Sequence, residues 1–271
     1  MNFYETLELI LTADTPKKKF ELFDHFYTNY KEENIEFSAS KEAVYFSLPS
    51  YSSVCKIVAP QKVPKRTNLT TKEGQINLLH AIAHIEYSAI DLALDAAYRF
   101  RDLPKEYYDD WLEVAEDEIR HFIMLQELLE ELDASYGDIE VHNALFEASQ
   151  KTQTLVERMA VVPRYLEANG LDATPMILKK LQNLPKNEML DKIKEKLNII
   201  LHEEIEHVKK GDIWFSYACQ KEGKEPSSYF EIIDKYYPQG FSRPRELNTE
   251  ARKEAGFSCS ELNFMAKREV C

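Results

Sequence analysis

Apolar residues recur at the spacing of an α-helix over four long stretches of the chain, and short breaks separate these stretches. The breaks contain proline or glycine, the residues that commonly end helices, at Leu103-Pro104, Ser135–Asp138 and Leu184-Pro185. The long stretches predict helices over residues 71–100, 106–132, 143–184 and 187–221. Four long helices joined by short connections are typical of an antiparallel up-down bundle.

The segments before and after these stretches have a different pattern. Residues 2–12 and 16–31 predict two short amphipathic helices, whereas residues 36–70 contain three prolines and predict an extended strap packed across a domain. Residues 223–271 predict a tail with two short helices. We therefore expect one structural domain of the all-α class, made of N-terminal helices and strap (1–70), a four-helix bundle (71–222) and the C-terminal helical tail (223–271).

The composition supports this all-α prediction. Only 7 of 271 residues are glycine, and Rossmann folds, β-sandwiches and phosphate-binding loops all use glycine in their turns. The net charge of −13 disfavours broad binding to nucleic acid, whose phosphates are also negative.

No apolar run reaches the roughly 20 residues of a membrane span, and Met1–Leu11 lacks a signal-peptide pattern. The four cysteines are widely spaced, so we expect a reduced, cytoplasmic protein.

Three glutamates lie where the helical pattern places apolar residues. Glu86, Glu118 and Glu204 each share a helix face with aliphatic or aromatic side chains. Removing a carboxylate from water costs several kcal/mol unless an opposite charge compensates it. Three such residues on three predicted helices therefore indicate that they share a cation.

Two of these glutamates are followed by a histidine one helical turn later. Glu118 precedes His121 and Glu204 precedes His207 at the i,i+3 spacing, which puts each pair on one helix face. Helical bundles that bind two metal ions use two such Glu-x-x-His motifs plus one glutamate from each remaining helix. With Glu86 as the glutamate of the first helix, the pattern predicts a di-metal site.

The alternative interpretation is a buried network of ion pairs. Arg120, Arg158 and Arg164 could supply its positive charges, but they do not account for the repeated Glu-x-x-His spacing. His84 lies about 200° around the helix from Glu86 at 100° per residue, which favours a structural role for that histidine.

The third helix offers two glutamates, Glu157 and Glu167, as the remaining ligand. Glu167 lies 18 residues before Pro185 and Glu204 lies 19 residues after it, so antiparallel helices bring them to one level. Glu157 would be displaced along the helix by roughly 13 Å at 1.5 Å per residue. We therefore predict Glu167, in a helix that continues past Gly170 with a kink or bulge. The predicted metal ligands are Glu86, Glu118, His121, Glu167, Glu204 and His207.

Several stretches of the chain together carry a family resemblance. They read LLHAIAHIEYSAIDLALDAAYRF, DWLEVAEDEIRHF, RMAVVPRYLEANGLDATP and ILHEEIEHVKKGDIWF, with VPKR before them and NTEARKEAGFS in the tail. They resemble a bacterial family of ferritin-like proteins known mainly as a domain of unknown function. This resemblance implies a ferritin-like bundle with a metal centre. More distantly, YLEANGLD resembles the third-helix motif of ferritin-like tRNA-modifying hydroxylases, which implies that Glu167 binds iron.

The ligand set favours a non-haem di-iron or iron–manganese oxidoreductase that activates dioxygen. Two transition-metal ions, iron before manganese, suit ligation by carboxylates and two imidazoles, whereas zinc more often takes cysteine and more histidine. The substrate would be an unknown small or tRNA-borne molecule, and an external donor would supply electrons because no flavin or dinucleotide motif is present. The alternative is a ferroxidase-like or non-catalytic metal-handling protein. Strap and tail would obstruct a storage shell, so we expect a monomer or small homo-oligomer.

Overall fold

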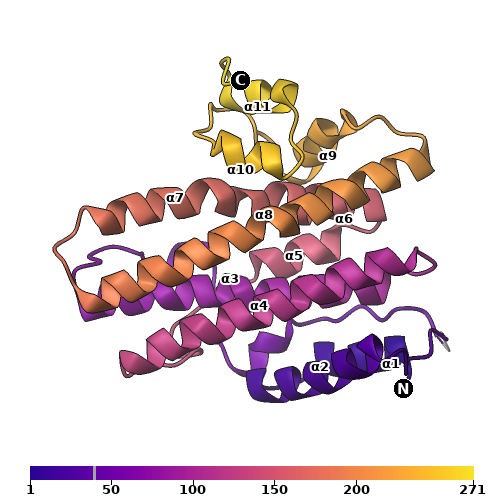
Figure 1. The fold of residues 1–271 in the computed structure, drawn as a ribbon, viewed down its shortest axis with the longest axis horizontal. Coiled ribbons are helices and arrows are strands. Elements are labelled where there is room, and N and C mark those ends of the chain that lie inside the picture. Colours follow the sequence, from indigo (N-terminus) through magenta and orange to yellow (C-terminus); the bar gives the residue numbers. More distant parts are fainter. Residues whose placement is uncertain (39–40) are drawn as a thin grey trace. The chain divides into compact units, whose positions relative to one another are not determined.

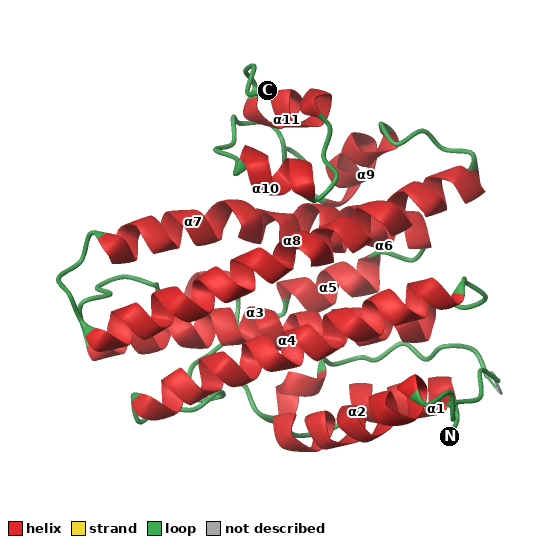
Figure 2. Cartoon of the chain, in the orientation of Figure 1, coloured by secondary structure: helices red, strands yellow, loops and turns green. Residues whose placement is uncertain are grey.

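Helices are the regular elements of this computed structural model, which describes residues 1–38 and 41–271 (Figure 2). No strand occurs among these residues, although two isolated bridges join extended segments. The all-α prediction is confirmed. The chain divides into two compact units, unit 1 (residues 1–146) and unit 2 (residues 147–271), and each is described separately.

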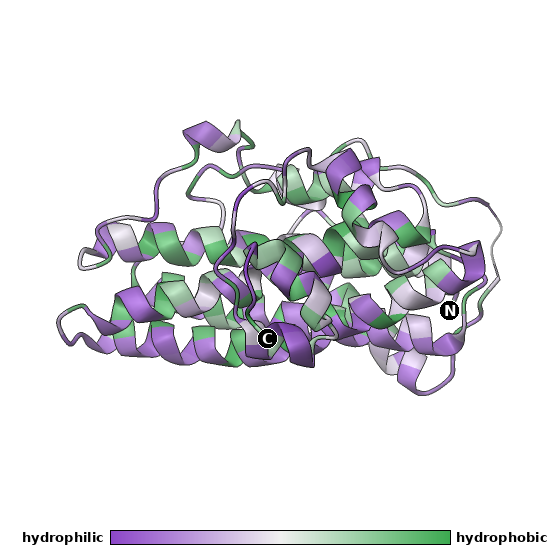
Figure 3. Cartoon of the chain, turned by 90° about the horizontal axis from the view of Figure 1, so that it is seen from above, coloured by the Kyte–Doolittle hydropathy of each residue, from purple (hydrophilic) through white to green (hydrophobic). Residues whose placement is uncertain are grey.

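Unit 1 is built on an antiparallel hairpin of two long helices, α3 (Lys72–Arg99) and α4 (Lys105–Glu131) (Figure 1). Thr71 caps the start of α3 by accepting a hydrogen bond from the amide of Gly74. A Cβ at Gly74 would lie 2.2 Å from the carbonyl oxygen of Asn68, so this position requires glycine. The long helices of the chain carry both hydrophobic and hydrophilic residues (Figure 3). The fully buried positions of α3 and α4 include Leu79, Leu94, Leu112 and Leu125.

Two shorter helices, α1 (Phe3–Leu11) and α2 (Pro16–Lys31), confirm the helices expected at the N-terminus. Phe3 is fully buried, and its ring contacts the edge of Phe26 and that of Tyr108, which belongs to α4. Lys19 is also fully buried, where its ammonium group lies 2.5 Å from Asp91 of α3. An apolar cluster and a buried ion pair therefore hold α1 and α2 against the hairpin.

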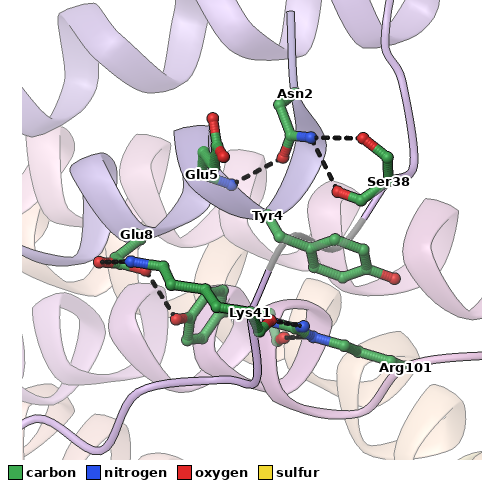
Figure 4. A pocket seen from close by; sticks show the side chains of 8 residues that line it. Asn2, Tyr4, Glu5, Glu8, Ser38, Lys41 and Arg101 are labelled. Atoms are coloured by element: carbon green, nitrogen blue, oxygen red, sulfur yellow. Dashed lines mark hydrogen bonds and ion pairs between the residues drawn. The ribbon is translucent and has the colours of Figure 1, made fainter.

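The described part of the expected strap contains no α-helix and forms only two 3₁₀ turns, η1 (Ser50–Ser53) and η2 (Pro60–Lys62). Its beginning is tied to α1 at a small polar pocket (Figure 4). There the side-chain amide of Asn2 donates to the carbonyl oxygen of Ser38, and Lys41 pairs with Glu8 at 3.0 Å. The polar groups of this pocket bind one another, so we interpret it as an attachment point of the strap.

Unit 2 is built on a second helical hairpin, whose longer arm is α8 (Glu188–Glu222). The other arm is irregular, as the sequence predicted. It runs through α6 (Leu155–Val161), the π-helical turn η3 (Val162–Glu167) and α7 (Ala168–Gln182). The short helix α5 (Ala144–Lys151), which begins just before the unit boundary, is separated from α6 by residues 152–154, a break that the sequence did not predict. Pro163 lacks an N–H and its ring clashes with the carbonyl of a regular helix, which explains why the chain widens into a π turn here.

The tail consists of α9 (Ser228–Tyr236), α10 (Thr249–Glu254) and α11 (Cys259–Ala266), and it packs within unit 2. Cys259 forms a disulfide with Cys271, so the expectation of four reduced cysteines is wrong for this pair. Sequence spacing did not reveal the pair because the tail folds back on itself. Cys55 and Cys219 are free and buried. Within the described residues, no helix combines the length and the apolar character that crossing a bilayer requires.

We expect the disulfide to stabilise the tail. The two cysteines are 12 residues apart, and closing a loop of this size in the unfolded chain corresponds to about 2–3 kcal/mol. Cys271→Ser should therefore unfold at a lower temperature than the wild type in calorimetry without reductant. Adding a reductant should lower the wild-type transition to that of the variant, which itself should not respond. If the unfolding temperature of the wild type does not change when reductant is added, the result would contradict the disulfide.

Candidate metal centre

Three of the predicted ligands converge in unit 1. Glu86 lies on α3, while Glu118 and His121 lie on successive turns of α4, and all three are buried, with exposed fractions of 4%, 1% and 0%. The Nδ1 atom of His121 lies 3.1 Å from a carboxylate oxygen of Glu86 and 3.5 Å from one of Glu118. One atom from each side chain can be chosen so that the three lie within 4.8 Å of one another. This buried cluster can hold a metal ion.

The buried carboxylates of Glu86 and Glu118 require a positive charge close to them. Burial and the neighbouring charge of Glu118 raise the pKa of Glu86 to about 7. Burial alone would lower the pKa of His121, but hydrogen bonds to Glu118 and Glu86 outweigh it and raise that pKa to about 11. A protonated imidazole therefore supplies the positive charge between the two carboxylates. A metal ion bound at the same Nδ1 would displace that proton.

His84 lies two residues before Glu86 but has other partners. Its Nε2 lies 2.8 Å from the carbonyl oxygen of His142, which can only accept, so Nε2 carries the hydrogen. Its Nδ1 therefore accepts a hydrogen bond from the hydroxyl of Tyr136 at 2.9 Å. Burial lowers the pKa of His84 to about 4. The neutral ring links α3 to the chain after α4, which agrees with the structural role predicted for it.

Unit 2 repeats the Glu-x-x-His arrangement on α8. The Nδ1 atom of His207 lies 3.6 Å from a carboxylate oxygen of Glu204, close to the 3.5 Å between His121 and Glu118. His207 is buried, and 14% of the Glu204 side chain is exposed. The two motifs therefore hold an imidazole nitrogen and a carboxylate oxygen at almost the same separation, one motif in each unit.

Glu167 is the last residue of the π turn, and the packing of unit 2 places it level with the α8 motif. Pro163 packs so closely against Gly211 that a Cβ on this glycine would lie 2.2 Å from the proline ring. The two arms are antiparallel, so a step toward higher numbers on one arm matches a step toward lower numbers on the other. Glu167 lies four residues after Pro163 and His207 lies four residues before Gly211, so Glu167 lies opposite His207. This contact supports the level argument made from the sequence.

Glu157, the other candidate, already has a structural role. It accepts the hydrogen bond of a capping box with Thr154 at the start of α6, and its carboxylate lies 2.6 Å from Lys235 of the tail. Burial alone would raise the pKa of Glu157, but hydrogen bonds from Lys235 and Tyr236 hold it below the ordinary value. The sequence could have suggested this role, because Thr-x-x-Glu is a capping-box pattern.

The arginines of the alternative ion-pair interpretation have identifiable partners elsewhere. Arg120 pairs with Asp117 on the surface of α4 at 2.5 Å. Arg164 lies between Asp212 at 2.7 Å and Glu261 at 3.0 Å, so two carboxylates balance its charge. His121, rather than one of these two arginines, lies beside both Glu86 and Glu118.

The fold and the site define the class of this protein: it is all-helical and has a buried glutamate–histidine cluster that can hold a metal ion. The chain belongs to the family described as a protein of unknown function, DUF455, which matches residues 12–263. It is 37% identical to an uncharacterized protein of Haemophilus influenzae, over an alignment that covers 98% of this chain and 94% of that protein. No solved structure matches the chain.

The stability of the metal-free protein should fall as the pH rises. The pKa values of Glu86 and His121 are about 7 and 11, each above its ordinary value, so the folded state binds more protons than the unfolded state. This extra proton binding contributes its full free energy of unfolding below the ordinary pKa of each group, about 4.5 for Glu86 and 6.5 for His121. It is lost as the pH rises through 7 and then toward 11.

Urea unfolding of metal-free protein at pH 6 and pH 9 measures this loss. The midpoint should be lower at pH 9, and Glu86→Gln should reduce the difference because it removes both a titrating group and a partner of His121. Glu116→Gln, a change at an exposed position of α4, the helix of His121, is the control and should leave the difference unchanged. An equal pH effect in wild type and Glu86→Gln would show that the cluster is not responsible.

The two glutamates of the third helical stretch should behave differently when they are replaced. Glu167→Ala should lose one of the two metal ions that the sequence predicts, with little effect on unfolding of the metal-free protein. Glu157→Ala should retain both ions but lose about 1 kcal/mol of stability, because it removes half of a capping box and an ion pair. Elemental analysis and urea unfolding of the two variants test this pair of outcomes. The reverse pattern would make Glu157 the ligand.

Proposed function

We propose that this protein is a ferritin-like, non-haem di-metal carboxylate protein and that the two helical hairpins together form its four-helix bundle. The observation that supports this most strongly is the repeated Glu-x-x-His geometry, with Nδ1-to-carboxylate distances of 3.5 and 3.6 Å in the two units. Two similar Glu-x-x-His half-sites, each on a long helix of an antiparallel hairpin, match the ligand pattern of di-metal bundles.

In this proposal each hairpin supplies three ligands. Glu118 and His121 bind one ion and Glu204 and His207 bind the other. Glu86 and Glu167, from the opposite arms of the hairpins, complete or bridge the pair. The donor set contains four carboxylates and two imidazoles, which suits iron first and manganese second. The buried cluster of unit 1 fits such an ion, because its protonated imidazole already marks the place of a positive charge.

The reaction we propose is oxidation or hydroxylation of an unknown small or tRNA-borne substrate with dioxygen. When bound, the two metal ions would supply the redox chemistry toward dioxygen, and an external donor would supply electrons. The residues of the chain would hold the metal ions in place and exclude water from them. Tyr87 and Phe122 follow Glu86 and His121 directly in the sequence, and both are buried, with their rings 5.3 Å apart. Both rings belong to the packed interior of unit 1, where Glu86 and Glu118 are themselves buried, so this interior keeps water from the two carboxylates.

We expect the protein to bind about two transition-metal ions per chain. Anaerobic reconstitution with iron(II) or manganese(II), followed by elemental analysis, measures this number. Glu204→Gln should lose at least one ion. Glu206→Gln is the matched control, because Glu206 lies two residues away on the exposed side of α8 and pairs with Lys209. Less than half an equivalent of metal in the wild type would contradict the proposal.

Oxygen consumption then separates the two functional classes. An enzyme with a suitable reductant should consume dioxygen over many turnovers, and Glu204→Gln should abolish this consumption. A metal-handling protein should oxidise its bound iron once and then stop. The mass of the protein in solution gives a second distinction, since a storage shell contains many copies and a monomer or small homo-oligomer does not.

A further inference from the structure

The C-terminal tail binds the backbone on both sides of Glu167. The carbonyl oxygen of Ala168, the next residue, accepts a hydrogen bond from the guanidinium of Arg252 at 2.9 Å. The carbonyl oxygen of Arg164, three residues before Glu167, accepts one from the hydroxyl of Tyr229 at 3.0 Å. Arg252 lies on α10 and Tyr229 on α9, so two separate helices of the tail bind this short segment.

Arg252 is held in place by a buried ion pair. It is 1% exposed, and its guanidinium binds both carboxylate oxygens of Asp172, at 3.0 and 2.7 Å. Asp172 lies on α7, five residues after Glu167, and also accepts a hydrogen bond from the amide of Asn248. A bidentate arginine–carboxylate pair has a fixed geometry that lysine cannot reproduce. Arg252 therefore fixes the distance between the tail and the start of α7.

Arg164 fixes the other end of the segment. It lies inside the π turn, is 2% exposed, and is bound by Asp212 of α8 and Glu261 of α11. Its guanidinium also lies over the ring of Tyr229, 4.5 Å from the ring centre. A π turn is less regular than an α-helix and can relax to it by shifting one residue. Buried contacts on both sides of the turn oppose such a shift.

We propose that the C-terminal tail positions Glu167 for metal binding, with Arg252 and Tyr229 as its positioning residues. This inference rests on the proposed function, in which Glu167 is a ligand. The tail holds the π turn in the register that places Glu167 level with His207. A shift of one residue in a helix turns a side chain by about 100°, which would direct the carboxylate away from the α8 motif.

Hydrogen exchange of the metal-free protein tests whether the tail holds the turn. Arg252→Lys keeps the charge but loses the bidentate geometry, and Tyr229→Phe removes only one hydroxyl. In both variants the amide hydrogens of residues 164–172 should exchange at least tenfold faster than in the wild type, with unchanged exchange in α3 and α4. Arg268→Lys is the matched control, because Arg268 is an exposed tail residue that pairs with Glu246. Wild-type exchange in both Arg252→Lys and Tyr229→Phe would overturn the proposal.

Manganese(II) titration tests whether the tail acts through Glu167. Arg252→Lys and Tyr229→Phe should each weaken the second metal equivalent at least tenfold, whereas Arg268→Lys should not. In a Glu167→Gln background, Arg252→Lys should cause no further loss, because the ligand it positions is already gone. Additive losses would assign the tail a general structural role and overturn the proposal. A wild type that binds no metal would overturn the proposed function, while the exchange rates would still show whether the tail holds the turn.

Discussion

Burying two carboxylates beside one imidazole is the constraint on which unit 1 depends. Glu86 and Glu118 could not both remain charged in an apolar interior without a cation, and His121 supplies one by keeping its proton. Because one atom from each of the three side chains must lie within a few ångströms of the others, Glu86 on α3 must lie at the same height along the hairpin as Glu118 and His121 on α4. The caps and breaks that set the hairpin register, Thr71 and Pro104, therefore also set the site.

Unit 2 meets a similar demand with a less regular helix. Pro163 forces a π turn, and Gly211 accepts the proline ring at a distance that any side chain would prevent. Two buried arginines then hold the irregular turn. Arg164 binds Asp212 of α8 and Glu261 of the tail, and Arg252 of the tail binds Asp172 of α7. Irregular helical turns are frequent at functional sites because they direct a side chain that a regular helix would direct elsewhere. The tail of this protein, which the sequence alone left without a role, is bound to this turn.

Local signals in the sequence predicted much of this structure. The all-α class, the helices on both sides of Pro104 and Pro185, and the irregularity near Pro163 all follow from apolar spacing and from proline, which act over a few residues. The burial of Glu86, Glu118 and His121 also followed, because their positions fall within apolar stripes. The ferritin-like arrangement of the two hairpins and the metal ligation remain proposals.

What the sequence by itself determined was which helix face each glutamate and histidine occupies, because helical periodicity is a local property of the backbone. Only the tertiary structure decided what each charged group meets. It paired His121 with both carboxylates, assigned Glu157 to a helix cap and Lys235, bound Arg164 to Asp212 and Glu261, and joined Cys259 to Cys271. These partners lie on elements distant in sequence, and their choice depends on packing, which no spacing within one helix records.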